Sequence, residues 1–208
     1  MQLSERDFRI LEAVIRAHIR TGEPVASFVV AQLLHEDVSS ATIRNAFTRL
    51  TEDGFLLQPH TSAGRIPTKE AYATYTEALG NTYEAHMQTL KHALRVAERL
   101  QHELHLLTGI YDGHIQHLRG FSSLLHDSEM FDDSSARAIG DLLDAVIESP
   151  DELLTIPKGA NVRILVRGGD VSGATLLVAR AGPDRSLFAA GPMRMNYERA
   201  LNLMTHEE

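Results

Sequence analysis

The chain contains 208 residues, enough for one large domain or two small ones, and 43% of them are hydrophobic. It has no cysteine, which excludes disulfides, cysteine nucleophiles and cysteine-ligated metal sites. The formal net charge of −8 argues against a chain coated by nucleic acid or by an anionic membrane, although it allows a local basic face. No apolar run approaches the roughly 20 residues of a membrane helix, and charged residues from Glu5 to Asp7 stand where a signal peptide would be apolar. We therefore expect a cytoplasmic protein with no membrane partner.

Helical periodicity dominates the first part of the sequence. Apolar residues recur at three- and four-residue steps from Phe8 to Ile19, and Ser4 is the predicted N-cap of this first helix. A second helix is predicted over residues 27–34 and a third over residues 39–54. A short strand, a loop and a return strand are predicted over residues 55–66. Three helices followed by two strands predict a winged helix-turn-helix.

A change of pattern at Gly80-Asn81 predicts two domains, at residues 1–80 and residues 81–208. Heptad-like spacing follows this boundary. It predicts a helix that packs either on its own domain or on a second subunit. The residues of this candidate dimerisation helix are Tyr83, Met87, Leu90, Leu94 and Leu104.

The rest of the second domain predicts mixed α and β structure. A helix is expected from about Ser134 to Ile147, and a last helix over residues 196–204. Three strands are expected at residues 162–167, 174–180 and 187–190, joined by turns that favour an antiparallel meander. The predicted fold class is α+β, mainly α, with a small antiparallel sheet.

The third predicted helix contains the residue types that read DNA. Arginine grips guanine and asparagine grips adenine, each through two hydrogen bonds, so Arg44 and Asn45 are the candidates for base contacts. Arg49 lies one helical step further and is expected at a phosphate. Short hydroxyls suited to phosphate occur in the first helical turn, at Ser39, Ser40 and Thr42.

The loop after this helix predicts a wing that lies along a groove or along the DNA backbone. Its candidate contacts, with the lysine that follows, are His60, Thr61, Ser62, Gly64, Arg65 and Lys69. Residues 38–69 carry four cations and two acids, a local charge of +2 in an acidic chain. The alternative is a winged helix whose solvated residues serve protein contacts.

Several segments resemble the heat-inducible transcription repressor HrcA family. In the N-terminal domain they are residues 20–25 (RTGEPV), residues 38–45 (VSSATIRN) and residues 59–68 (PHTSAGRIPT). The ten-residue segment is the most specific of the three. Far downstream, residues 191–201 resemble the Gly-Pro-x-Arg-Met-x-Tyr motif that closes members of this family.

This resemblance implies a bacterial repressor of chaperone operons that binds, as a homodimer, an inverted-repeat operator in double-stranded DNA. It implies a winged helix, then a sensor-like domain of the GAF type with a dimerising domain inserted into it. It also implies the chaperonin as a partner that keeps the repressor competent. The chain is shorter than family members, and the stretch from Gly109 to Met130 is compressed. We therefore expect a reduced GAF-like domain without the first sensor strands and most of the inserted domain.

Other patterns give weaker indications of function. Two histidine pairs at three-residue spacing could hold zinc or nickel, namely His102 with His105 and His114 with His117. No acidic or cysteine partner stands at a familiar spacing, so we expect no metal and no cofactor. His18, on the apolar face of the first helix, is expected to be a core or interface histidine. No nucleophile or phosphate-loop motif occurs, so nothing favours an enzyme.

Three functions remain open at this point. The favoured one is a sequence-specific repressor of heat-shock operons that blocks transcription by occupying an inverted repeat as a dimer. The second is a ligand- or metal-sensing regulator on the same winged-helix scaffold with a different operator. The third is a protein-interaction module that has lost DNA binding.

Overall fold

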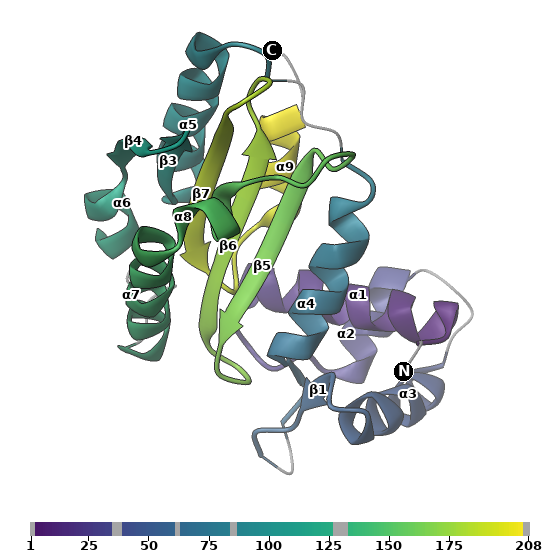
Figure 1. Ribbon diagram of the computed structural model, residues 1–208. Helices are drawn as coiled ribbons and strands as arrows, with labels where there is room; N and C mark the ends of the chain where they lie inside the picture. Colours follow the sequence, from purple (N-terminus) through teal and green to yellow (C-terminus); the bar gives the residue numbers. More distant parts are fainter. Residues whose placement is uncertain (1–2, 35–38, 61–62, 84–86, 127–132, 206–208) are drawn as a thin grey trace. The chain divides into compact units, whose positions relative to one another are not determined.

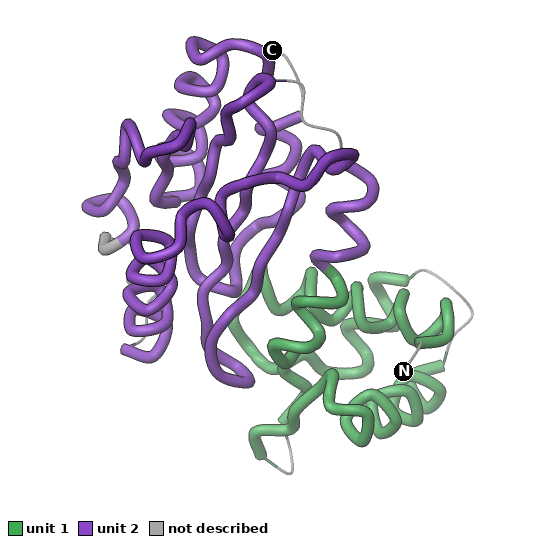
Figure 2. The backbone as a smooth tube through the Cα atoms, in the orientation of Figure 1, with its two compact units in different colours: residues 1–75 green, residues 76–208 purple. Residues whose placement is uncertain are grey.

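The computed structural model describes residues 3–34, 39–60, 63–83, 87–126 and 133–205. The chain divides into two compact units, residues 1–75 and 76–208, which Figure 2 colours separately. Both units combine helices with antiparallel strands, which confirms the predicted α+β class.

The first unit has the element order of a winged helix-turn-helix (Figure 1). Its elements are α1 (Glu5–Thr21), α2 (Ser27–Leu34), α3 (Ser40–Glu52), β1 (Leu56–Leu57), β2 (Ile66–Pro67) and the start of α4 (Lys69–Gly80). Ser4 caps α1 by accepting a hydrogen bond from the backbone N–H of Asp7. Ser39 caps α3 in the same way, with Thr42 as the donor. Gly22 ends α1 in the left-handed region, with a φ of 72°.

One apolar face of α1 holds the first unit together. Its buried residues recur every three or four positions, because this spacing keeps side chains on one side of a helix. Helices α2 and α3 pack against α1 and complete the core. The buried set includes Ile10, Leu11, Val14, Ile15, Val30, Ile43, Phe47 and Leu50. His18 is buried too, with Nδ1 3.0 Å from the backbone oxygen of Glu23, which confirms it as a core histidine.

The second unit is built on a five-stranded antiparallel sheet with the strand order β4-β3-β7-β6-β5. Its helices are α5 (Leu90–Leu104), α6 (Phe121–His126), α7 (Asp133–Glu148), α8 (Pro150–Leu154) and α9 (Tyr197–Thr205). Its strands are β3 (Leu107–Tyr111), β4 (Ile115–Arg119), β5 (Val162–Gly168), β6 (Gly173–Arg180) and β7 (Ser186–Pro192). Strand β7 lies at the centre and pairs with β3 on one side and β6 on the other.

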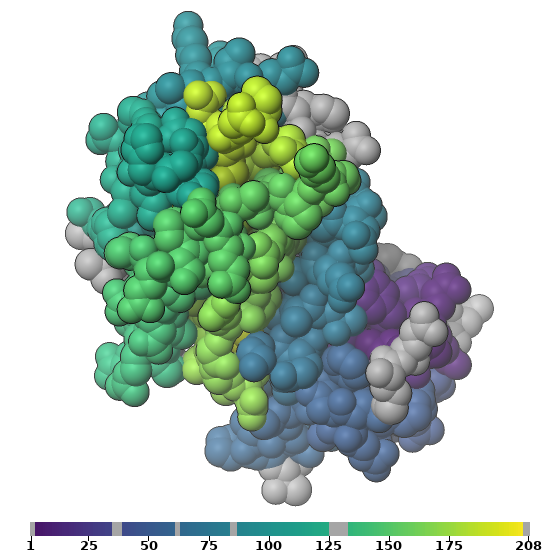
Figure 3. Space-filling view, viewed as in Figure 1, coloured from purple at the N-terminus to yellow at the C-terminus, as the bar shows by residue number. Residues whose placement is uncertain are grey.

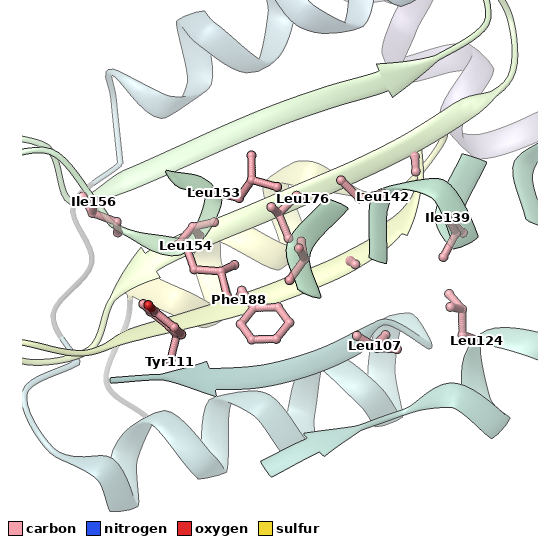
Figure 4. Close-up of a cluster of buried hydrophobic side chains, with 14 residues drawn as sticks. Leu107, Tyr111, Leu124, Ile139, Leu142, Leu153, Leu154, Ile156, Leu176 and Phe188 are labelled. Carbon is pink, nitrogen blue, oxygen red and sulfur yellow. The ribbon is translucent and has the colours of Figure 1, made fainter. Parts of the chain in front are cut away.

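The sheet of the second unit is covered on both faces, so β7 is buried along its whole length and β6 up to Ala179. Successive side chains of a strand point to opposite faces. Leu176 and Phe188 therefore join the cluster under α7 and α8, shown in Figure 4. On the opposite face, Thr175 contacts Tyr197 of α9. The guanidinium of Arg199, with that of Arg99, holds the pKa of the Glu103 carboxyl below its usual value and links α9 to α5.

The structure holds two strands that the sequence did not predict. Strands β3 and β4 lie at residues 107–119, at and after the start of the stretch expected to be compressed, so the described part of that domain has five strands instead of three. Its glycines suggested interruption, yet Gly109 lies inside β3, where a Cβ would come within 2.4 Å of the Phe188 ring. The ring needs that space, so the glycine serves packing. The predicted dimerisation helix is also shorter than expected, because α5 begins only at Leu90.

The downstream motif of the resemblance closes the sheet onto its last helix. The backbone N–H of Met193 donates to Gly173 at 2.8 Å, which fixes the chain as it leaves β7. The hydroxyl of Tyr197, which is buried, donates to the backbone oxygen of Met193 and also bonds to the hydroxyl of Thr175. Tyr197 therefore fixes both ends of the connection between β7 and α9.

Replacing Tyr197 by phenylalanine tests this role. The backbone oxygen of Met193 and the Thr175 hydroxyl would lose their shared partner while buried, so we expect Tyr197→Phe to lower the free energy of unfolding by about 1–3 kcal/mol. Urea unfolding followed by circular dichroism measures the loss. A variant as stable as the wild type would show that these hydrogen bonds do not hold the connection.

Candidate nucleic-acid interface

Helix α3 buries one face and exposes the other. Its inner face packs against α1 and α2 and consists of Ile43, Ala46, Phe47 and Leu50. Its outer face is exposed and consists of Ala41, Arg44, Asn45 and Thr48. Because a helix repeats every 3.6 residues, burial of the inner set determines which side chains point outward. The two residues predicted to read bases are therefore neighbours on the exposed face.

The first turn of α3 is ordered by its hydroxyl residues. The Ser39 hydroxyl accepts from the backbone N–H of Thr42 at 3.2 Å, and the two hydroxyl oxygens are 3.1 Å apart. Ser39 is exposed, while Ser40 and Thr42 are half-buried. Two of the residues predicted for phosphate contact, Ser39 and Thr42, thus also form the cap that starts the helix.

Arg49 is held inside the first unit. Its guanidinium donates to the carboxylate of Asp7 at 2.6 Å and so ties α3 to the first turn of α1. The Ser4 hydroxyl donates to the other oxygen of the same carboxylate at 2.9 Å. Half of the Arg49 side chain, 52%, stays accessible. Its expected phosphate contact therefore competes with an internal ion pair that sequence spacing does not reveal.

The wing is anchored at its return strand by Gly64 and Arg65. The backbone of Arg65 pairs with Val25 through hydrogen bonds of 2.8 and 2.9 Å. A Cβ at Gly64 would lie 2.3 Å from the Val25 oxygen, so this approach requires a glycine. The Arg65 guanidinium turns back and donates to the Thr51 hydroxyl at 3.1 Å. Gly64 and Arg65, which were both predicted to contact DNA, therefore hold the wing in place.

The remaining wing candidates differ in their surroundings. His60 is exposed, and its backbone oxygen accepts from Ala63 in a turn at 2.9 Å. Thr61 and Ser62 lie outside the described residues. Lys69 is half-buried, with its amine 3.9 Å from the carboxylate of Glu70.

Thr68, just before Lys69, joins α4 to the turn that follows α3. Its hydroxyl caps α4 by accepting from the backbone N–H of Ala71. The same hydroxyl reaches the backbone oxygens of Gly54 at 2.7 Å and Phe55 at 3.1 Å. The start of β1 is thereby fixed to the start of α4.

Two residues of the exposed α3 face were missed by the sequence analysis. Thr48 follows Arg44 by four positions, and its hydroxyl donates to the Arg44 backbone oxygen at 3.1 Å. Ala41 precedes Arg44 by three positions on the same face. The helical period alone identifies both, since residues three and four apart share a face.

The predicted dimerisation helix packs on its own unit. Residues Ala93, Val96, Ala97 and Leu100 form the buried face of α5, which lies against β3, β7 and α9. Of the candidate residues, Met87 is buried, whereas the half-buried ones are Tyr83, Leu90, Leu94 and Leu104. Of the two alternatives left open, the structure favours packing within the domain.

The histidine pairs are not brought together with further ligands. His102 and His105 are exposed, as are His114 and His117. Across the described residues, no three side chains of histidine, aspartate or glutamate gather in a way that could hold a metal ion.

Substitution of Gly64 tests how the wing is held. We expect Gly64→Ala to lower the free energy of unfolding by about 1–3 kcal/mol, because the new methyl group collides with the Val25 carbonyl. Gly80→Ala is the matched control, since a Cβ there meets nothing within 4 Å. Urea unfolding should find that control unchanged or slightly more stable. Equal stability of the two variants would contradict the close approach.

Comparison with known proteins supports a relationship over part of the chain. No family model matches the sequence. The heat-inducible transcription repressor HrcA of Syntrophobacter fumaroxidans is 52% identical over 77 residues, and that of Lachnoclostridium phytofermentans is 47% identical over 79. HrcA of Acidothermus cellulolyticus is 40% identical over 110 residues, which is 53% of this chain. These matches span only 22–30% of the relatives' own length.

A solved structure shares the fold across nearly the whole chain. It is described as a hypothetical protein and superposes with a TM-score of 0.71 at 15% identity, covering 97% of this chain and 94% of that one. None of the described helices is both long and apolar enough to span a bilayer. The resemblance drawn from the sequence motifs is confirmed over 37–53% of the chain, which is similar there to the heat-inducible transcription repressor HrcA family.

Proposed function

We propose that this chain is a sequence-specific DNA-binding repressor in which α3 enters the major groove. The observation that carries the proposal is the outer face of α3, where Arg44 and Asn45 stand side by side and exposed. Within the described chain, neither side chain is engaged by another residue, in contrast to Arg49 and Arg65. An arginine and an asparagine free to form two hydrogen bonds each are the pair that reads guanine and adenine.

The rest of the first unit suits this placement. The capped N-terminus of α3 carries the positive end of the helix dipole and the Ser39 hydroxyl, both of which attract phosphate. His60 extends from the wing toward solvent and would lie over the sugar-phosphate backbone or the minor groove. The local charge of +2 over residues 38–69 favours DNA, although the whole chain is acidic.

The target we propose is an inverted repeat upstream of heat-shock genes. Matched relatives are named heat-inducible transcription repressors, and one winged helix reads only one half-site. A homodimer would place two α3 helices a whole number of helical turns apart and would repress by occupying the operator. We propose that it acts in the bacterial cytoplasm, with the chaperonin as a protein partner by family resemblance.

Binding to an inverted repeat from a chaperone operon tests the function directly. Fluorescence anisotropy of the full chain should show a large preference for the repeat over a scrambled duplex, and the preference should persist at higher salt. Arg44→Ala should weaken binding to the repeat by about 1–3 kcal/mol per half-site and relax specificity. Equal binding to both duplexes would indicate another operator. No binding to either would favour a protein-interaction module.

Releasing Arg49 tests whether its internal ion pair limits phosphate contact. Asp7→Asn removes a negative charge and frees the guanidinium, so affinity should rise alike for all sequences. The slope of log affinity against log salt should steepen by up to about one. Glu12→Gln, which breaks the Glu12–Arg16 pair within α1, is the matched control and should change neither quantity. An unchanged salt slope in Asp7→Asn would remove Arg49 from the interface.

A further inference from the structure

Helix α7 carries a second apolar stripe that is largely exposed on its own unit. The first stripe packs against the sheet and consists of Ser135, Ile139, Leu142 and Val146. The second is displaced by one residue, about 100° around the helix. It consists of Ala136, Gly140, Leu143 and Ile147. Leu143 is half-buried and packs in part against the core cluster under α7, whereas the other three are exposed, with 64% of Ile147 accessible. Figure 3 shows this helix at the surface of the second unit.

Nothing in its own unit explains why residue 140 is a glycine, Gly140. A Cβ built at this position meets nothing within 4 Å, and the backbone is ordinary helix. Glycine in the middle of a helix lowers stability relative to alanine, because it loses more conformational freedom on folding. The side chains at a contact set the distance between two helices. A glycine on an exposed helix face therefore makes sense if another helix packs closely against it.

We infer that the second stripe is covered by the same stripe of a second copy of this chain, packed antiparallel about a two-fold axis. Spacings of four, three and four residues place the stripe at alternating a and d positions of a heptad. With the axis between Gly140 and Leu143, Gly140 faces the partner's Leu143, and Ala136 faces the partner's Ile147. Each large side chain then lies over a small one. The pattern is self-complementary, as a two-fold interface requires.

Charged residues beside the stripe fit the same arrangement. Arg137 and Asp144 are exposed, seven residues apart, at successive e positions, and neither forms an ion pair within the described chain. The e positions of two antiparallel helices face each other, so Arg137 lies beside the partner's Asp144 and the two-fold axis repeats the contact. A parallel pair in register would instead set Gly140 against the partner's Gly140 and leave a void.

The size of the interface sets its strength. A helix of 16 residues is about 24 Å long, so one helix pair buries less than the roughly 1,200–2,000 Å² of a standard stable interface. The dimer is therefore weak and depends on concentration. Two half-sites on one duplex hold the subunits together by raising their effective concentration. Only this last step rests on the proposed function, because the helix face stands independently of DNA.

Sedimentation equilibrium of the full chain without DNA tests the interface. The wild type should dimerise as its concentration rises. Gly140→Leu should raise the dissociation constant at least about tenfold while the circular dichroism spectrum stays the same, since the Cβ meets open space in the monomer. Asp141→Leu adds the same side chain one position away from the stripe and should leave the dissociation constant unchanged. A wild type that stays monomeric at its highest soluble concentration, or a Gly140→Leu dimer of wild-type strength, would overturn the proposal.

Charge reversal tests the antiparallel register. Arg137→Glu and Asp144→Arg should each weaken the dimer, and the double variant should restore it toward the wild-type dissociation constant. The two side chains are two helical turns apart within one chain, so restoration reports contact between subunits. A double variant as weak as the single ones would reject this packing. If these results hold while the wild type fails to bind any inverted repeat, the proposed function fails and the α7 interface stands.

Discussion

Burial of one face of α3 is the constraint on which the candidate interface depends. Ile43, Phe47 and Leu50 occupy the core between α1 and α2, and their side chains fix the rotation of the helix about its own axis. A rotation by one residue could bring Phe47 into water and turn Asn45 toward the core. The hydrophobic effect thus aims the polar side chains, although none of the apolar residues would touch DNA.

The electrostatics of the first unit depend on which of its cations are paired with other residues of the fold. Arg49 is paired with Asp7 and Arg65 is bonded to Thr51, so these two guanidiniums stiffen the unit. Of the two cations of α3, Arg44 is the one that has no such partner within the described residues. In the proposed DNA complex, an acidic chain with this one exposed arginine would rely on base contacts more than on general attraction to phosphate, which would favour specificity over non-specific affinity.

Much of the fold follows from local patterns, and the departures have physical causes. Helical periodicity and cap residues located α1, α3 and α7, and alternation with turn glycines located β5, β6 and β7. Strands β3 and β4 were not predicted, because Gly109 resembles a break in the pattern. The glycine is needed there because the ring of Phe188, far along the chain, occupies the space of a side chain.

The candidate site divides in the same way. The outer position of Arg44 follows from helical spacing, whereas the partners of Arg49 and Arg65 are 42 and 14 residues away in the sequence. No local pattern predicts such distant partners.

The order of strands in the sheet has a consequence for how the protein is made. The central strand, β7, is the last of the five to be synthesised, yet β3 needs it as a neighbour. On the ribosome the winged helix can close early from contacts close in sequence, while one edge of β3 waits unpaired until some 75 further residues emerge. Late closure leaves apolar strand edges open during synthesis and again after any thermal opening. We therefore expect the second unit to fold more slowly than the first and to be the half of the chain that is more prone to aggregate.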